Sequence, residues 1–120
     1  MKFNILGNYY DKAFHLPATS GPLAVENIIK RFSPADLSLL LWETPIDYRD
    51  VDRVIESANI GFKAWRKIKQ EERNHFLKKY QEEVSKRKDD IALAISYEMG
   101  KPLWESQTEV ASVIAKINVT

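Results

Sequence analysis

The chain has 120 residues, 44% of them hydrophobic and 29% charged, a composition typical of one folded globular domain. Its formal net charge of +1 indicates neither a nucleic-acid nor an acidic-membrane partner. It contains no cysteine, which excludes disulfide frameworks and thiolate chemistry. No apolar run approaches the roughly 20 residues that cross a bilayer, and none has the pattern of a signal peptide. We therefore expect a cytoplasmic protein.

The first 46 residues show little helical periodicity and favour short strands. Gly7 and Asn8 interrupt an apolar run. This pattern predicts a strand before them, a tight turn at them, and a second strand at Tyr9 and Tyr10.

Two further strands are predicted in the same part of the chain. One covers residues 23–32, between turn residues on either side. The other covers residues 37–42, an apolar run bounded by Pro34 and Pro45 that is too short for a helix.

From about residue 47 the apolar residues recur at steps of three and four, which is typical of amphipathic helices. Four helices are expected, over about 47–68, 70–88, 89–99 and 102–118. The first and last carry the longest apolar stripes, made of Val51, Val54, Ile55, Ala58, Phe62 and Trp65, and of Leu103, Val110, Val113, Ile114 and Ile117. The fold class is therefore α+β and mainly α, with a β-hairpin or meander in 1–46 and helices in 47–120.

Three residues are predicted to set the ends of the later helices. Gly100 ends the third helix by taking the left-handed backbone conformation. Pro102 opens the fourth at its first position, where a missing N–H costs nothing. Asp89 or Asp90 caps the start of the third helix.

The histidines and glycines provide no catalytic or metal-binding pattern. His15 and His75 have no acidic residue or cysteine at zinc-ligand spacing, so we interpret both as surface or packed residues and expect no metal site. Gly100-Lys101 lacks the earlier glycine and the following Ser or Thr of a phosphate loop. No G-x-G-x-x-G motif follows a strand.

Three glutamates near the end of the chain are candidates for acid–base catalysis. Glu105 and Glu109 lie four residues apart on one helix face, and Glu98 precedes the Gly100 break. Paired carboxylates of this kind carry acid–base catalysis in some enzymes. A salt bridge to Lys101 or Lys116, or plain solvent exposure, is the interpretation that we favour.

The same region resembles a known family. Glu98-Met-Gly-Lys-Pro102, followed by Glu105 and Glu109-Val110, resembles the E-x-G-K-P-(x)n-E-V segment of the aldehyde dehydrogenase superfamily. Trp104, Thr108, Lys116 and Ile117 look like the branch that oxidises succinylglutamate semialdehyde during arginine breakdown. The resemblance implies the N-terminal hairpin arm and first helices of that fold, without its Rossmann core.

The resemblance also implies where the chemistry lies. In this family the thiol nucleophile, the activating glutamate, the oxyanion-stabilising asparagine and the NAD-binding strands lie further along the chain. We therefore assign no catalytic, cofactor-binding or metal residue here, and NAD or NADP belongs to the complete enzyme. The helix after G-K-P lines the aldehyde entrance in related enzymes, so Glu109, Val110 and Val113 are expected near that entrance.

Our first hypothesis is an N-terminal fragment of an NAD(P)-dependent aldehyde dehydrogenase, inactive alone, from a shortened gene or an expressed piece. Its end inside a helical pattern at 118–120 fits that hypothesis. The stripes of 51–65 and 103–117 would then be covered by homo-oligomerisation. The alternative is a non-catalytic helical module for interaction or oligomerisation. An acid–base enzyme built on the helix glutamates is a third hypothesis.

Overall fold

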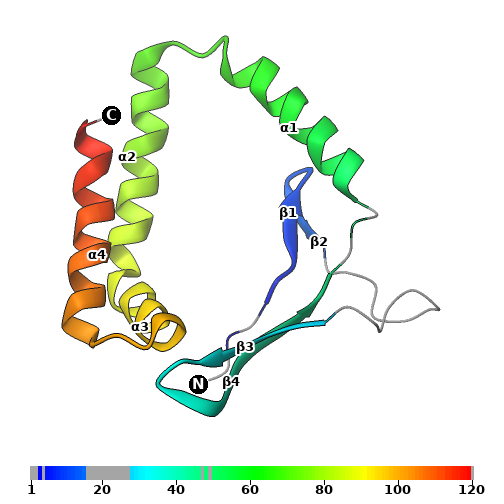
Figure 1. Ribbon diagram of the computed structural model, residues 1–120. Helices are drawn as coiled ribbons and strands as arrows, with labels where there is room; N and C mark the ends of the chain where they lie inside the picture. Colours follow the sequence, from blue (N-terminus) through cyan, green and yellow to red (C-terminus); the bar gives the residue numbers. More distant parts are fainter. Residues whose placement is uncertain (1–2, 4, 16–27, 47, 49, 120) are drawn as a thin grey trace. The chain divides into compact units, whose positions relative to one another are not determined.

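A computed structural model describes residues 3, 5–15, 28–46, 48 and 50–119 (Figure 1). The fold class predicted from the sequence is confirmed: short strands come first and helices follow. Each sheet of the described part has only two strands, so these residues form no Rossmann core. The elements are β1 (Asn8–Tyr10), β2 (Ala13–His15), β3 (Ile28–Ser33), β4 (Asp36–Pro45), α1 (Val51–Trp65), α2 (Gln70–Lys86), α3 (Lys88–Met99), α4 (Leu103–Lys116) and a 3-10 turn (Ile117–Val119).

The contacts group the chain into two compact units. The first contains residues 1–32 and 40–67, and the second contains residues 33–39 and 68–120. The division predicted at residue 46 follows the change from strands to helices. The packing instead groups α1 with the strands of the first unit, because α1 contacts β1.

The first hairpin turns at a different place from the one predicted. β1 and β2 pair antiparallel, and Tyr10 lies opposite Ala13. The turn is therefore made by Asp11 and Lys12, whose φ values are 49° and 64°, the left-handed pair that suits a tight hairpin.

The predicted turn at Gly7-Asn8 is wrong, because Asn8 already lies in β1. Gly7 takes a φ of 89° just before the strand, and a glycine adopts this value at little steric cost. Of the described residues before it, none belongs to a strand that pairs with β1. The Phe3 N–H instead donates to the Leu41 carbonyl at 2.9 Å.

The second hairpin joins β3 and β4 through Pro34 and Ala35. Of the strand predicted at 23–32, residues 23–27 lie outside the described part of the chain, and β3 covers the rest. The strand predicted at 37–42 is longer, because β4 runs from 36 to 45. Leu41, in its middle, is completely buried.

Tyr10 joins the first hairpin to α1. Its hydroxyl donates to Asp50 Oδ2 at 2.8 Å, and the Arg53 guanidinium lies 5.5 Å from its ring centroid. One residue along, the Asp11 N–H donates to Ser57 Oγ at 3.1 Å. Burial and the hydrogen bond to the Asp50 carboxylate raise the pKa of Tyr10. The hairpin therefore contacts one side of α1 through polar groups.

The apolar stripe of α1 is exposed. No residue of this helix is buried, and Ile55 and Phe62 are 55% and 60% exposed. The helix is also shorter than the predicted 47–68. Asp47 lies outside the described residues, and α1 begins at Val51, whose N–H donates to the Tyr48 carbonyl at 3.3 Å.

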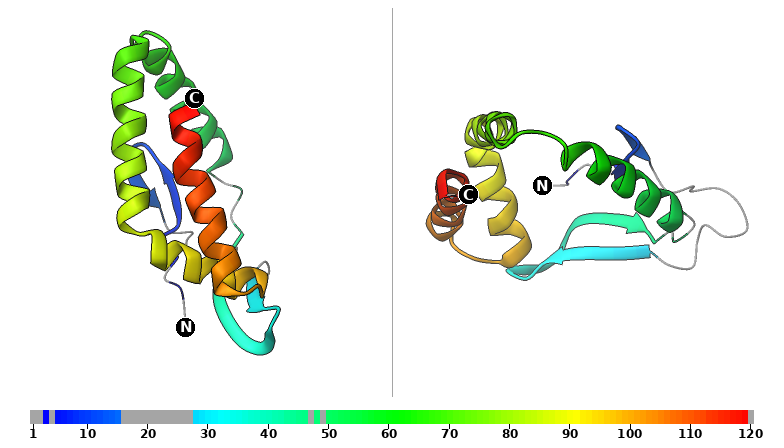
Figure 2. Two further views of the ribbon diagram at one scale, coloured as in Figure 1. Left: turned by 90° about the vertical axis from the view of Figure 1, so that its left-hand side faces the viewer. Right: turned by 90° about the horizontal axis from the view of Figure 1, so that it is seen from above.

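The second unit is a three-helix arrangement. α2 and α4 lie side by side and antiparallel, and α3 crosses near one end of the pair (Figures 1 and 2). The Gln81 amide on α2 donates to the Ile114 carbonyl at 2.8 Å and to Asn118 Oδ1 at 3.2 Å. Ala92 on α3 and Val110 on α4 are buried. Among the described residues, no helix meets the length and hydropathy that a bilayer crossing requires.

The helices of this structure begin without side-chain caps. The residues at the cap positions are Asp50, Lys69, Arg87 and Pro102, and none makes a capping hydrogen bond through its side chain. The predicted cap at Asp89 or Asp90 is therefore wrong. Both residues lie in the first turn of α3, where a carboxylate interacts favourably with the helix dipole.

The corner between α3 and α4 depends on Gly100, whose predicted left-handed conformation is confirmed by a φ of 67°. The glycine also packs closely, because an added Cβ would lie 3.0 Å from Pro34 Cβ and 3.2 Å from the Ala35 nitrogen. Pro102 stands at the cap position, and α4 begins one residue later than predicted, at Leu103.

We predict that alanine has opposite effects at two glycines. Gly100→Ala should lower the free energy of unfolding by about 1–2 kcal/mol or more, because alanine strains the left-handed backbone and its Cβ meets the hairpin tip. Gly61→Ala should raise it by about 0.5–1 kcal/mol, because Gly61 lies inside α1 with no atom within 4 Å of an added Cβ. Urea unfolding followed by circular dichroism measures both. A neutral or stabilising Gly100→Ala would contradict the role of the corner.

Candidate functional site

The corner between α3 and α4 carries Lys101 and precedes the candidate glutamates of α4, and its backbone is fixed by hydrogen bonds. The Gly100 N–H donates to the Ser96 carbonyl at 2.9 Å. The Ser96 hydroxyl donates to the Lys101 carbonyl at 2.7 Å. The Glu105 N–H donates to the Pro102 carbonyl at 3.1 Å. Lys101 is therefore held where its side chain runs along the first turns of α4.

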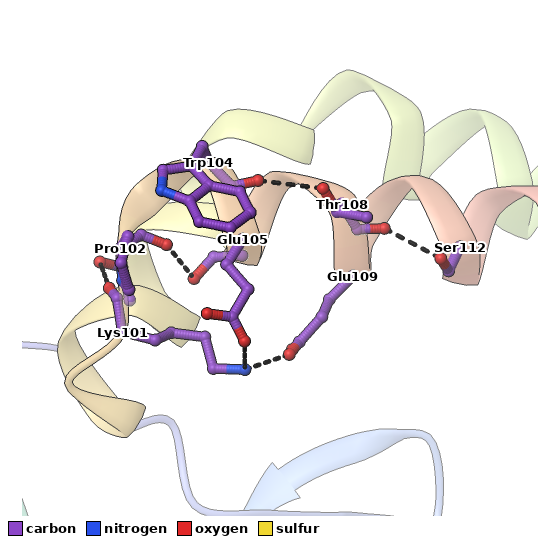
Figure 3. Close-up of polar contacts among 9 residues, drawn as sticks. Lys101, Pro102, Trp104, Glu105, Thr108, Glu109 and Ser112 are labelled. Atoms are coloured by element: carbon purple, nitrogen blue, oxygen red, sulfur yellow. Dashed lines mark hydrogen bonds and ion pairs between the residues drawn. The ribbon is translucent and has the colours of Figure 1, made fainter.

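The Lys101 ammonium lies between two carboxylates of α4 (Figure 3). Its Nζ is 3.1 Å from Glu105 Oε1 and also donates to Glu109 Oε1. The lysine side chain is only 20% exposed. The hydrogen bonds that Lys101 donates to Glu109 and then to Glu105 raise its pKa. The salt bridge favoured from the sequence is confirmed, with one lysine serving both glutamates.

This arrangement does not suit acid–base or nucleophilic chemistry. A general base needs a carboxylate or amine that is available to take a proton. Here both carboxylates accept hydrogen bonds from a cation that they keep protonated, and an ammonium has no lone pair for attack on a carbonyl. Glu98 lies on α3, before the corner, and is half-buried. The cluster is therefore an electrostatic connection between the corner and α4.

The hydroxyl groups further along α4 are used within the helix. Thr108 Oγ1 donates to the Trp104 carbonyl at 3.1 Å, and Ser112 Oγ donates to the Thr108 carbonyl at 2.9 Å (Figure 3). Bonds of this kind to the residue four positions earlier are common for Ser and Thr in helices. Ser106 is completely buried. In the part of the chain that the structure describes, the partners of these three hydroxyls are backbone carbonyls, and none is a histidine that could activate the hydroxyl.

The three residues expected near an aldehyde entrance lie in different environments. Glu109 is exposed and paired with Lys101. Val110 is 2% exposed, and Val113 is 49% exposed. The structure therefore gives solvent access to Glu109 and Val113 but not to Val110. Their place at an entrance stays a prediction.

Val110 borders a shallow hollow of about 210 Å³. The hollow lies within the second unit, between the start of α3 and the middle of α4. Its apolar lining comes from Val110, Ala111 and Ile114, and its polar rim from Lys88, Asp89 and Gln107. A lysine and an aspartate side by side on the rim offset each other's charge, so the hollow selects neither an anion nor a cation.

The corner does not fit the phosphates of a dinucleotide. Such a site needs several backbone N–H groups that point to one anion. The Gly100 N–H is already bonded to Ser96, and Pro102 has no N–H to offer. The close approach of Pro34 and Ala35 to Gly100 also fills the space that a phosphate would need.

The two histidines contact neighbouring aromatic rings and are not arranged as ligands. The His15 ring stacks on Tyr10 with a centroid distance of 3.8 Å, and its Nε2 lies 3.2 Å from the Tyr10 carbonyl. His75 meets Phe76 edge to face at 6.4 Å. Among the residues that the structure describes, no group of three potential metal ligands comes together.

Sequence reasoning missed two contacts that organise the corner and its helix. One is the Ser96 hydroxyl that binds the Lys101 carbonyl. The other is the Gln81 amide at the end of α4. Both join a side chain to a backbone carbonyl, and neither a serine nor a glutamine inside a helical pattern signals such a partner.

Comparison with known proteins identifies relatives for most of the chain. The family model described as "Aldehyde dehydrogenase family" matches residues 23–120. The N-succinylglutamate 5-semialdehyde dehydrogenase of Legionella pneumophila (strain Corby) is 38% identical over 93 residues, which are 78% of this chain and 19% of that protein. The protein of the same name from Burkholderia cenocepacia (strain HI2424) is 44% identical over 71 residues, which are 59% of this chain and 15% of that protein.

The chain thus spans about a fifth of the length of the first of these relatives. No solved structure matches it significantly.

We predict that Lys101 titrates above the ordinary lysine pKa and that Glu109→Gln lowers its pKa more than Glu105→Gln does. The stabilisation from this cluster should be fully present below the ordinary pKa and disappear as the pH rises through the raised value. NMR titration of the lysine side chains measures the pKa of Lys101 in the parent chain and in both variants. Lys86 is the control, because Glu83 raises its pKa independently. A Lys101 that titrates identically in the three proteins would contradict the prediction.

Proposed function

The chain belongs to the aldehyde dehydrogenase family, and we propose that it corresponds to the leading segment of an NAD(P)-dependent enzyme that oxidises succinylglutamate semialdehyde to N-succinylglutamate. The observation that carries this proposal is the 38% identity over 93 residues to a protein with that name. The Glu98 to Pro102 motif and the glutamates of α4 supply the detailed resemblance. The reaction would belong to arginine breakdown in the cytoplasm.

The proposed role of this segment is structural. The 120 residues contain no cysteine, so they cannot supply the thiol nucleophile that the family resemblance implies. Lys101, Glu105 and Glu109 are engaged with one another, and the corner does not fit a dinucleotide. We therefore propose that NAD or NADP and the reacting aldehyde are bound by residues other than these 120, and that the segment is inactive alone.

An alternative is a non-catalytic helical module for interaction or oligomerisation. The exposed stripe of α1 favours it, because an amphipathic helix with no buried residue is suited to a partner. The DNA downstream separates the two proposals. Coding capacity for the Rossmann and thiol-bearing parts, in any frame, supports the enzyme segment, and its absence supports the module.

Under either proposal we expect the 120-residue chain to associate with itself. Exposed apolar patches larger than a few hundred Å² are uncommon on monomers, and α1 presents several large apolar side chains to solvent. Light scattering at increasing protein concentration should show a rising average mass. A constant monomer mass up to millimolar concentration would contradict self-association.

We predict that the purified 120-residue chain forms no NADH or NADPH from succinylglutamate semialdehyde. The reason is the missing nucleophile, because the family's reaction begins with attack of a thiolate on the aldehyde. The absorbance of the reduced cofactor measures the result, and the complete Burkholderia cenocepacia relative serves as the positive control. Turnover that persists after every contaminating dehydrogenase is removed would overturn the proposed division of roles.

A further inference from the structure

The sides of α1 are unequally covered. The hairpin of β1 and β2 reaches the helix at Asp50 and Ser57, which are seven residues apart and therefore lie on one side. The apolar stripe lies on the adjacent side, since successive residues are rotated by about 100°. Its members are Val51, Val54, Ile55, Ala58, Phe62 and Trp65, all of them exposed.

The other long stripe is less available. Val110, at the centre of the α4 stripe, is 2% exposed, and Ile114 and Ile117 are half-buried. The packing of α4 within its own unit already uses these residues. A second copy of the chain could therefore bury more apolar surface at α1 than at α4.

The stripe of α1 is symmetric about Ala58. Val51 and Trp65 lie seven residues before and after it, and Val54 and Phe62 lie four residues before and after it. Two copies that pack antiparallel with Ala58 at the centre therefore place a large aromatic of one copy opposite a valine of the other. The small side chain of Ala58 lets the two backbones approach at the crossing point.

The charges of α1 also favour an antiparallel pair. The first half of the segment 50–67 carries Asp50, Asp52 and Glu56 against a single Arg53, and the second half carries Lys63, Arg66 and Lys67 with no acidic residue. An antiparallel arrangement sets the acidic half of one helix beside the basic half of the other, and it opposes the two helix dipoles. A parallel arrangement would place like charges together.

A hollow beside the stripe gives the aromatic residue a place to bind. It measures about 350 Å³ and lies between the first hairpin and the start of α1, lined by Asn8, Tyr9, Asp50, Val51, Val54 and Ile55. In the antiparallel pair Trp65 of the second copy lies opposite Val51, at this hollow. Shape and charge thus point to the same arrangement.

We propose that a second copy of this chain binds the exposed face of α1, with the two α1 helices antiparallel and crossing at Ala58. This inference rests on the self-association proposed above and adds its surface and geometry. It is independent of the catalytic role of the family, so the cofactor-reduction assay neither supports nor weakens it.

Sedimentation velocity of the 120-residue chain tests the surface. We expect a monomer–dimer equilibrium with a Kd between about 1 μM and about 1 mM, the range of a small interface. Ala58→Arg should raise the Kd at least about tenfold, because it places two guanidinium groups at the crossing point. Ala64→Arg is the matched control, since it makes the same substitution at another exposed alanine of α1, on the side away from the stripe. Circular dichroism verifies that both variants keep their helix content.

Cysteine cross-linking tests the orientation, because the chain has no cysteine of its own. Ala58→Cys should form a disulfide-linked dimer on mild oxidation. Val51→Cys should not, because the two introduced thiols would be about 21 Å apart along the helices and a disulfide needs Cα atoms within about 7 Å.

Three results would overturn the inference. If the chain stays monomeric at every concentration, both the proposed surface and the self-association on which it rests are ruled out. Dimerisation that Ala58→Arg leaves unchanged keeps self-association but places it on another surface. Cross-linking of Val51→Cys as fast as that of Ala58→Cys shows a parallel pair.

Discussion

The left-handed backbone at Gly100 is the constraint on which the second unit depends. It lets α3 stop and α4 start within three residues, so that α4 returns antiparallel to α2. Any residue with a Cβ would be strained there, and its Cβ would lie in tight contact with Pro34 and Ala35 at the hairpin tip. The short connection places Lys101 over the first turns of α4, where Glu105 and Glu109 bind it. The packing of Val110 and Ser106 follows from the same return of the chain.

The first unit is organised by different forces. Its hairpin meets α1 through a tyrosine–carboxylate hydrogen bond and a backbone bond to Ser57, while the apolar side of the helix stays exposed. Burial of apolar surface is the dominant favourable contribution to folding, and in this unit it comes from Tyr10 and Leu41 rather than from α1. In a family member about four times as long as this chain, other residues are available to cover that surface.

The helices could be predicted from the sequence because their signals are local and repeated. The stripes of α1 and α4 extend over three or more turns, and Gly100 followed by Pro102 is a strong sign of a helix break. The hairpin turn was missed because Asp11 and Lys12 take left-handed conformations without a glycine, whereas the nearby Gly7 attracted the prediction. The pairing of Lys101 followed from i, i+4 spacing. The burial of Val110 did not, since it depends on α3 packing against the same helix.

The helices also begin without capping side chains, and this affects how they melt. A capped helix has part of its first turn held by its own sequence, independently of its surroundings. Here α3 and α4 each bury residues within their unit, whereas α1 has no buried residue to compensate for its uncapped start. Short helices that lack packing unravel from their ends rather than all at once. Heating therefore acts on the two units unequally, with a gradual loss of α1 and a sharper, more cooperative transition of the helices that pack together.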